Sequence, residues 1–275
     1  MKKHLSTILF VTVLITGISL LLYPTVSNYW NMQIQSRAVA SYKEATGNLT
    51  QQDTTALFET AQTYNTLLRQ YGIQGFYDPS LIPGYEEALD VTGTGIMGYI
   101  TIEKLDLELP IYHSTSPDVL QIAAGHLEGT SLPTGGEGTH CVISAHRGLP
   151  SAILFSDLDK MEVGDTFTIT VLDQLMTYQV DQVLVVDPNQ VDALQIEEGK
   201  DLCTLMTCTP YGVNTQRLLV RGVRIPNPTP EEATRVILDE ARRIPVIGVG
   251  VVVSLPCLLA ALILLLKFWR KPKER

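Results

Sequence analysis

The sequence predicts a mainly β fold, a closed barrel with short helices over residues 96–226, preceded by a helical extension and flanked by two transmembrane helices. Two observations carry this prediction. Short apolar segments separated by turn residues recur along residues 96–226, a pattern that is typical of a β-barrel. Uncharged apolar runs, each long enough to cross a bilayer, lie near both ends of the 275-residue chain.

The first apolar run predicts a transmembrane helix over residues 5–23, after a short tail of residues 1–4 that contains two lysines. From Leu5 to Leu22 there is no acidic or basic residue, and this length suits a hydrocarbon core of about 30 Å. A cleaved signal peptide is the alternative. Tyr23-Pro24-Thr25 offers no small-residue cleavage site, so a retained helix is favoured.

The second apolar run predicts a transmembrane helix over residues 244–266, joined to the barrel by a linker or helix over residues 227–243. The tail that follows, residues 267–275, is strongly basic. By the positive-inside rule both termini are then cytoplasmic, and everything between the spans is extracellular. A cleavable wall anchor has a similar tail, but no LPxTG-type signal stands just upstream of Ile244.

The charge of the chain argues against nucleic acid as a partner. Residues 1–3 and 267–275 hold 7 of the 20 basic residues and 1 of the 29 acidic ones. The segment between them therefore has 13 basic and 28 acidic residues, a net charge of −15. Binding to a phosphate backbone requires clustered cations, which so acidic a domain does not offer.

Residues 24–95 predict an extracellular helical extension that ends in a loop. Two helices are expected between Gln33 and Gln70, broken at Gly47-Asn48. The second begins near Thr50 or Asp53, since both are good helix N-caps, and its apolar residues recur at spacings of three and four. The segment from Tyr71 to Gly98, rich in glycine, reads as a connecting loop.

In the barrel region the apolar period changes to two. Leu105, Leu107, Leu109 and Ile111 alternate with other residues, as in a half-buried strand. Further strands are expected over residues 139–145, 166–172, 176–186, 202–207 and 217–225. Short helical turns are expected over residues 117–124 and 150–159.

Three reactive side chains, His146, Cys208 and Arg217, stand where predicted strands end or begin. Transfer of a peptide bond needs a nucleophile, a proton donor for the leaving amine, and positive charge at the developing oxyanion. Cys208, His146 and Arg217 have these properties in that order, and the two cations would also favour the reactive thiolate. Each signal alone is weak, because a cysteine in an apolar strand is usually a packing residue. The combination points to cysteine chemistry.

The sequence around these side chains resembles a known family. Thr-Leu-Met-Thr-Cys208-Thr-Pro-Tyr-Gly-Val-Asn-Thr-Gln-Arg217 is similar to the TLxTC signature and downstream arginine of the class C, or pilus-assembly, sortases. The similarity extends through residues 125–133 and 142–152, so that it covers roughly residues 95–225. The flanking transmembrane helices suit the same class.

The resemblance implies a sortase-type barrel and a membrane-anchored cysteine transpeptidase on the outer face of a Gram-positive cell. Such an enzyme cleaves an LPxTG-like sorting signal between Thr and Gly and holds the acyl chain as a thioester on Cys208. A pilin lysine then resolves the thioester. The resemblance makes His146 the general acid and then base, and makes Arg217 the group that positions substrate and stabilises the oxyanion. It implies no cofactor.

The resemblance also points to a lid loop at Asp78, Pro79 and Ser80. Class C sortases often have Asp-Pro followed by an aromatic residue, the Asp pairing with the catalytic Arg and the ring covering the Cys. Here the third residue is Ser80, although Phe76 or Tyr77 could shield the site instead. The alternative is that Asp-Pro simply initiates a turn.

The alternatives to pilus assembly are a sortase that anchors proteins to a cell-wall precursor, a surface cysteine hydrolase that uses water, and a non-catalytic surface scaffold. No metal is expected, because the His and Cys spacings differ from zinc-ligand sets such as paired CxxC. His113, His126 and His140 are expected to make structural hydrogen bonds. Arg147, Arg221 and Arg224 are expected to be peripheral charges, with Arg221 an alternative substrate contact.

The remaining cysteines raise the question of a disulfide. Cys141 precedes His146 by five residues and Cys203 precedes Cys208 by five. If their strands are parallel neighbours, the two thiols lie opposite each other, and a disulfide would need Cα atoms within about 7 Å. Cys257 lies within the second apolar run, where it is expected to act as a small apolar residue.

Overall fold

The computed structural model of the chain describes residues 2–228, with side chains from residue 9 onward. The second predicted transmembrane helix, residues 244–266, lies outside the described residues. So do the basic tail, Cys257 and the linker beyond residue 228.

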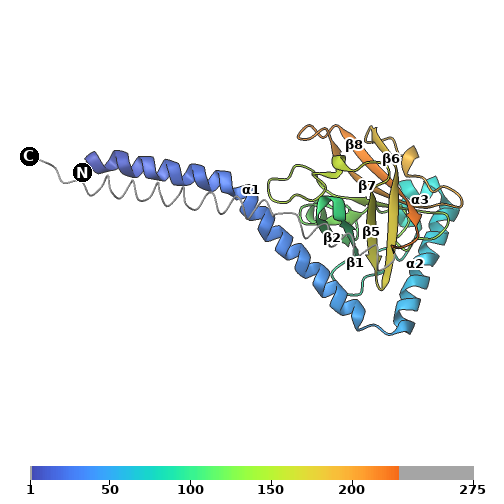
Figure 1. The fold of residues 1–275 in the computed structure, drawn as a ribbon. Helices are drawn as coiled ribbons and strands as arrows, with labels where there is room; N and C mark the ends of the chain where they lie inside the picture. The colour runs from blue at the N-terminus through green and yellow to red at the C-terminus, as the bar shows by residue number, and fades with distance from the viewer. Residues whose placement is uncertain (1, 229–275) are drawn as a thin grey trace, which may run out of the picture. The chain divides into compact units, whose positions relative to one another are not determined.

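Eight strands close into a barrel in the order β1-β2-β3-β4-β7-β8-β6-β5, which confirms the predicted architecture (Figure 1). Most neighbours are antiparallel, but β2 with β3 and β4 with β7 are parallel. The strands are β1 (Ile96–Ile102), β2 (Leu107–Tyr112), β3 (Ala124–His126), β4 (Thr139–Ser144), β5 (Thr166–Val171), β6 (Gln174–Val186), β7 (Asp201–Thr209) and β8 (Gln216–Ile225).

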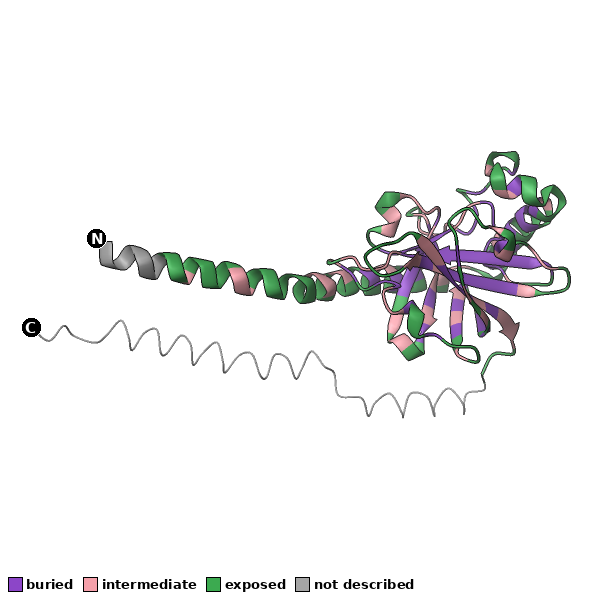
Figure 2. Cartoon of the chain, turned by 90° about the horizontal axis from the view of Figure 1, so that it is seen from above, coloured by how far each residue is buried: buried purple, intermediate pink, exposed green. Residues whose placement is uncertain are grey.

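The barrel interior is filled by apolar side chains, so it forms a packed core. Buried residues line the strands in Figure 2, and along β5 burial follows the alternation of side chains between the two faces of a sheet. On β7, for example, Cys203 and Leu205 belong to the interior core, whereas Met206 belongs to a separate cluster. The strands therefore have distinct inner and outer faces.

The N-terminal helix differs from the prediction. The transmembrane helix expected over residues 5–23 and the helix expected from Gln33 are one continuous helix, α1 (Lys2–Gly47), with Pro24 inside it. A proline removes one backbone hydrogen bond, and here the helix continues through that loss. Among the described residues, Leu9–Gly47 is the one helical stretch long and apolar enough to cross a membrane.

The C-terminal part of α1 packs against the barrel. Tyr42 is fully buried, and its hydroxyl donates to Met97 O at 2.9 Å and accepts from the backbone N–H of Leu172 at 2.8 Å. These two contacts join the helix to β1 and to the turn between β5 and β6. Lys43 adds an exposed ion pair with Glu108 of β2 at 3.3 Å. The helix that carries the apolar run is thus attached directly to the barrel.

The second helix, α2 (Gln51–Tyr71), confirms the prediction. Its N-cap is Thr50, and Thr50 and Asp53 form a reciprocal capping box. Asn65 on its buried face donates to Leu132 O at 3.1 Å and accepts from the N–H of Leu132 at 2.7 Å. These bonds attach α2 to the segment between β3 and β4.

The expected loop after α2 contains more structure than predicted: helix α3 (Ile73–Tyr77), the 3₁₀ turn η1 (Pro79–Leu81) and strand β1. Two further boundaries were wrong. Leu105 lies in the 3₁₀ turn η2 (Glu103–Leu105) rather than in β2, and residues 150–157 are irregular, with only η3 (Leu158–Lys160) at their end. The remaining short helices are α4 (Pro117–Leu120), within the predicted range, and η4 (Asp192–Leu194).

Candidate active site

Cys208 and Arg217 face each other across two neighbouring strands. Strands β7 and β8 are antiparallel, and Cys208 is the direct register partner of Arg217. Paired residues in such a ladder have Cα atoms about 4.5–5.5 Å apart. The eight residues between them form the end of β7, a short loop and the start of β8, so their proximity follows from the hairpin.

His146 reaches the same level from the other side of β7. Strands β4 and β7 are parallel, and their register ends with Ser144 beside Met206. The next residue, Ala145, donates its N–H to Met206 O at 3.2 Å and accepts from the Thr207 hydroxyl at 2.8 Å. Continuing by one residue places His146 beside Cys208.

All three side chains belong to the outer face of the barrel at one end. On β7 and β8 the neighbours of Cys208 and Arg217 two residues away, Met206 and Leu219, belong to the outer cluster. The neighbour preceding His146, Ala145, belongs to the interior core. Because side chains alternate between the faces of a sheet, Cys208 and Arg217 are on the same outer surface, and the same alternation, continued past the end of β4 at Ser144, would bring His146 to it.

The three groups differ in how they are held. Cys208 and His146 are both half-buried, and burial lowers the pKa of the His146 imidazole below its usual value. Arg217 donates from Nη1 to two backbone carbonyls of its own loop, Gln216 O at 3.1 Å and Asn214 O at 3.4 Å. The guanidinium would therefore rotate away from these carbonyls to bind a group on Cys208.

An apolar floor continues along the outer face from the candidate nucleophile. It consists of four buried side chains with partly buried ones packed on them: Val142, Val186, Leu194 and Leu219, with Phe76, Leu127, Leu184, Ala193 and Met206. These residues come from β4, β6, β7 and β8 and from the segments that pass over them. We call this set the outer-face cluster. It gives a dry surface beside Cys208 for the apolar part of a peptide.

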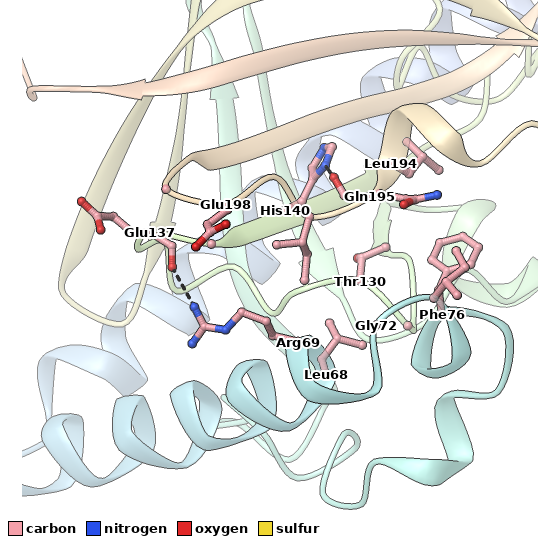
Figure 3. Close-up of a pocket in the computed structure, with 15 residues that line it drawn as sticks. Leu68, Arg69, Gly72, Phe76, Thr130, Glu137, His140, Leu194, Gln195 and Glu198 are labelled. Carbon is pink, nitrogen blue, oxygen red and sulfur yellow. Dashed lines mark hydrogen bonds between the residues drawn. The ribbon is translucent and has the colours of Figure 1, made fainter.

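Beyond the outer-face cluster lies a cavity of about 610 Å³ (Figure 3). One wall is formed by α2 and α3, through residues such as Leu68 and Phe76. The other wall is the loop between β6 and β7, residues 187–200, through Leu194 and Gln195. His140 also lines it, and Phe76 and Leu194 belong both to this lining and to the outer-face cluster.

The loop 187–200 is attached to the barrel by His140. The ring Nδ1 lies 2.8 Å from Gln195 O (Figure 3), and Nε2 lies 2.7 Å from the Thr204 hydroxyl. A carbonyl only accepts, so Nδ1 carries the proton, and a neutral ring then accepts from Thr204 at Nε2. Burial lowers the pKa of His140 below its usual value, which favours this neutral form. The expected structural role of His140 is confirmed.

A second contact holds the same loop. Arg221 on β8 forms ion pairs with Asp181 at 2.7 Å and with Glu197 of the loop at 2.6 Å. Its guanidinium is thereby occupied on both sides. The expectation that Arg221 is a peripheral charge was wrong, and both carboxylates leave it poorly placed for a substrate contact. Arg224 stacks over the Tyr178 ring at 5.7 Å.

The predicted lid residues lie beside the cavity wall. Asp78 ends α3, and its carboxylate accepts from the Ser80 hydroxyl at 2.5 Å, with Pro79 beginning η1 between them. Among the described residues Asp78 forms no ion pair with Arg217. Phe76 packs on the outer-face cluster, whereas Tyr77 is 69% exposed. Phe76 is thus the aromatic residue that covers part of the outer face.

Arg147 was expected to be a peripheral charge, and its contacts in this region were not predicted from the sequence. Its side chain is only 8% exposed and is ion-paired with Asp159 at 2.5 Å. Its Nη1 donates to the Thr209 hydroxyl at 3.4 Å, and the guanidinium lies 5.7 Å from the Tyr211 ring. Thr209 and Tyr211 follow Cys208 closely, so Arg147 connects the segment after His146 to the segment after Cys208. Its position directly after His146 in the sequence was the signal that could have indicated this role.

Cys141 and Cys203 are direct register partners in the parallel pair β4 and β7, as the equal spacing suggested. Both side chains are buried in the barrel core and both are free thiols in this structure. Burial raises the pKa of Cys203 well above its usual value, so it is an unreactive thiol. Cys208, half-buried at the outer face, is the most accessible of the three cysteines within residues 2–228.

His113 and His126 make the structural hydrogen bonds that were expected. His126, fully buried, lies 3.0 Å from the Tyr85 hydroxyl and 2.9 Å from Ser131 O. His113 lies 2.8 Å from Ala88 O. Within the described part of the chain no three His, Cys, Asp or Glu side chains are grouped as metal ligands would be.

Comparison with known proteins agrees with this geometry. Residues 100–225 match the sortase domain family. The crystal structure of sortase C1 from Streptococcus agalactiae is 47% identical and aligns over 70% of this chain and 100% of that one, with a TM-score of 0.64. Sortase C from Streptococcus pneumoniae is 43% identical over 70% of this chain and 99% of that one, with a TM-score of 0.62.

More distant relatives match over the barrel. Sortase D of Bacillus subtilis is 27% identical over 131 residues, which is 46% of this chain and 63% of that protein. Sortase A of Streptococcus agalactiae is 29% identical over 46% of this chain and 52% of that protein. The chain thus spans between about half and two thirds of the length of these curated relatives.

Proposed function

Because this chain belongs to the sortase family, we propose that it is a membrane-anchored cysteine transpeptidase with Cys208 as nucleophile, His146 as acid and base, and Arg217 as oxyanion stabiliser. The observation that carries the proposal is the strand register, which supports a meeting of these three residues on one outer surface. Cys208 and Arg217 are register partners, and His146 follows Ala145 at the adjoining edge of β7.

The first half of the proposed reaction forms a thioester. The Cys208 thiolate attacks the carbonyl carbon of the Thr–Gly bond in an LPxTG-like sorting signal. The oxygen becomes an oxyanion, which the Arg217 guanidinium stabilises with a permanent charge. When the C–N bond breaks, the His146 imidazolium gives its proton to the leaving glycine amine. The threonine carbonyl is then held on Cys208 Sγ.

The second half transfers the acyl chain to an amine. Neutral His146 takes a proton from the incoming neutral amine as the amine nitrogen attacks the thioester carbon, which restores the imidazolium. Collapse of the second oxyanion releases Cys208 as the thiolate and leaves an amide bond. Burial lowers the pKa of His146, which favours the neutral ring that this step needs. Water at the same position would give hydrolysis instead.

The proposed acyl acceptor is a lysine side chain of a pilin subunit. Its support is the similarity to class C enzymes, one of which is described in terms of pilin substrate specificity. A second candidate function, attachment of proteins to a cell-wall precursor, is supported by the weaker similarity to sortase A proteins. The identities of 47% and 43% against 29% and 28% favour the pilus reading.

The proposed location is the cell membrane. The apolar part of α1 anchors the chain, and the barrel lies outside the cell. With the apolar run at residues 244–266 as a second span, both termini are cytoplasmic. A reporter that is active only in the cytoplasm, fused after residue 275, tests the second span: activity supports two spans, and its absence contradicts them.

The function is tested with the full chain in detergent, a peptide containing an LPxTG-like signal, and a second peptide with one lysine. We expect an amide-linked product whose mass is the sum of the two peptides minus the released C-terminal fragment. Cys208→Ala should abolish it, whereas Cys203→Ala, which removes a buried thiol from the same strand, should retain it. Hydrolysed peptide without the amide product would favour the hydrolase reading, and cleavage by Cys208→Ala would contradict the assignment.

A further inference from the structure

The segment that follows His146 is held by the anchor helix. We define the His146 loop as residues 147–157. Two asparagines of α1 bind its outer rim: Asn31 donates from Nδ2 to Ser151 O at 2.7 Å, and Asn28 Oδ1 accepts from the backbone N–H of Ile153 at 2.9 Å. These side chains are three residues apart, so they project from one face of the helix.

The other side of the His146 loop is attached to the barrel. The N–H of Phe155 donates to His146 O at 3.1 Å, and the N–H of Gly148 donates to the Ser156 hydroxyl at 3.0 Å. Ala152, Leu154 and Phe155 are buried in the core. Within the described residues, rim residues 150–153 make hydrogen bonds outside the loop only to Asn28 and Asn31.

The contacts with α1 lie close to the predicted end of the membrane-spanning part. Asn28 and Asn31 follow Tyr23 by five and eight residues, a rise of at most about 8–12 Å along a helix. The headgroup region on each side of a bilayer is roughly 5–8 Å thick. The rim of the His146 loop is therefore at the level of the membrane surface.

Exposed aromatic and apolar side chains at this level fit a membrane interface. Trp30 is 68% exposed, and Tyr23 and Tyr29 are also exposed. Tryptophan and tyrosine are enriched where a membrane helix leaves the hydrocarbon. On the rim of the His146 loop, Ile153 is 46% exposed beside Asn28. An exposed isoleucine suits contact with lipid at this height.

We propose that Asn28 and Asn31 are positioning residues, through which the membrane-held helix α1 fixes the His146 loop and sets the active site at the lipid surface. The role of the loop in catalysis rests on the proposed function of His146. The contacts run from α1 to Ser151 and Ile153, and from Phe155 to the backbone of His146. The partner of the exposed rim is the lipid surface. A substrate still inserted in the same bilayer would then present its cleavage site at the right height.

The two asparagines allow a matched test, because one accepts and the other donates. Asn28→Asp keeps an oxygen acceptor for the Ile153 N–H. Asn31→Asp removes the N–H donor and sets a carboxylate against the Ser151 carbonyl. Both variants add one negative charge to the same helix, one turn apart. Gln35→Ala serves as control, since Gln35 donates from the same helix to Ile122 O at 2.7 Å, outside the His146 loop.

The first measurement is hydrogen exchange of the backbone amides of residues 148–156 in the full chain, reconstituted in lipid nanodiscs. A lost hydrogen bond changes a local opening equilibrium by about fivefold. We expect exchange to accelerate about fivefold or more in Asn31→Asp and to stay near wild type in Asn28→Asp and Gln35→Ala. Equal exchange in all four proteins would contradict the proposal, whatever the chain catalyses.

The second measurement is peptide cleavage by the same four proteins. The outer-face cluster, on which the peptide would lie, is built from elements other than the His146 loop. Asn31→Asp should therefore lower kcat severalfold and leave KM within twofold, and Asn28→Asp should retain kcat. A raised KM with unchanged kcat would contradict a positioning role. If exchange is altered in Asn31→Asp but the wild-type protein cleaves no peptide, the proposed function fails and the contact between helix and loop stands.

The third measurement tests the lipid surface. A nitroxide attached at residue 153 of the full chain in nanodiscs should be protected from a water-soluble relaxation agent. A nitroxide on Val183, an exposed residue of β6, is the control and should be accessible in the same nanodiscs. A label at 153 that is as accessible as the label at 183 would contradict the membrane contact.

Discussion

His140→Leu removes the side chain that attaches the loop 187–200 to the barrel. His140 is 1% exposed, and it makes two hydrogen bonds, to Gln195 O and to the Thr204 hydroxyl. Each lost bond costs about 1 kcal/mol, and a buried partner left unsatisfied costs about 1–3 kcal/mol. The free energy of unfolding should therefore fall by about 2–4 kcal/mol at neutral pH. Gln has a donor and an acceptor, so His140→Gln should lose less.

The loss should depend on pH in a defined direction. Burial lowers the pKa of His140 in the folded protein, whereas the unfolded value is about 6.5. The unfolded chain then binds a proton more readily, and the stability due to neutral His140 is present above pH 6.5 and falls as pH drops towards the folded pKa. The slope approaches about 1.4 kcal/mol per pH unit. The difference between wild type and His140→Leu should shrink between about pH 7.5 and pH 5.

The assay is urea unfolding of the full chain in detergent, followed by the near-ultraviolet circular dichroism of the buried tyrosines at several pH values. Other titrating groups, His146 included, are common to both proteins, so their contribution cancels in the difference between them. A stability difference that is constant from pH 7.5 to pH 5 would refute the neutral, doubly bonded ring; a loss well under 1 kcal/mol at neutral pH would refute the attachment itself.

Three further predictions concern the site. Arg217→Ala should lower kcat/KM for peptide cleavage about hundred- to thousandfold, as expected for loss of an oxyanion stabiliser, while Arg224→Ala on the same strand stays within a few fold; a small effect of Arg217→Ala would remove it from catalysis. If the segment with Phe76 shields the outer-face cluster from substrate, Phe76→Ala and Asp78→Ala should both raise the rate of peptide hydrolysis. Tyr77→Ala, at an exposed position, should not. Unchanged rates in all three variants would contradict the lid. Arg147→Ala should lower the free energy of unfolding by about 1–3 kcal/mol, because it removes a charged hydrogen-bond partner from a nearly buried site. Lys160→Ala, in the exposed pair with Asp157, should lower it by less than about 1 kcal/mol. Equal losses would mean that Arg147 contributes no more than a surface charge.

The part of the site that could be predicted from the sequence is the part built from regular strands. Cys208 and Arg217 belong to one hairpin, so their meeting follows from strand pairing alone. The pairing of β4 with β7 is nonlocal, but the equal spacing of Cys141 to His146 and Cys203 to Cys208 indicated its register. Alternation then places the three reactive groups on one face.

The parts that could not be predicted depend on close backbone approach or on irregular segments. Residues 96–98, the start of β1, were read as the end of a glycine-rich loop. A Cβ at Gly98 would lie 2.6 Å from Thr170 O, so the glycine permits the packing of β1 on β5. The first helix was expected to end at residue 23, but α1 continues through Pro24.

The contacts made by irregular loops were equally hidden. His140 binds Gln195, a residue 55 positions away in a loop with no periodic pattern. Asn28 and Asn31 bind a segment more than a hundred residues away, and nothing in the helix pattern distinguishes them from other polar residues. Such contacts follow from the packing of the whole chain, so local propensity does not indicate them.

The central claim is that Cys208 carries the acyl group during transfer. It is tested most directly by incubating the full chain with a sorting-signal peptide, without an amine acceptor, quenching in acid, and mapping the modified residue by mass spectrometry. We predict the mass of the peptide fragment ending in threonine on Cys208, released by hydroxylamine, with Cys141 and Cys203 unmodified. No adduct on Cys208 while the peptide is cleaved, or an adduct on another residue, would contradict the account.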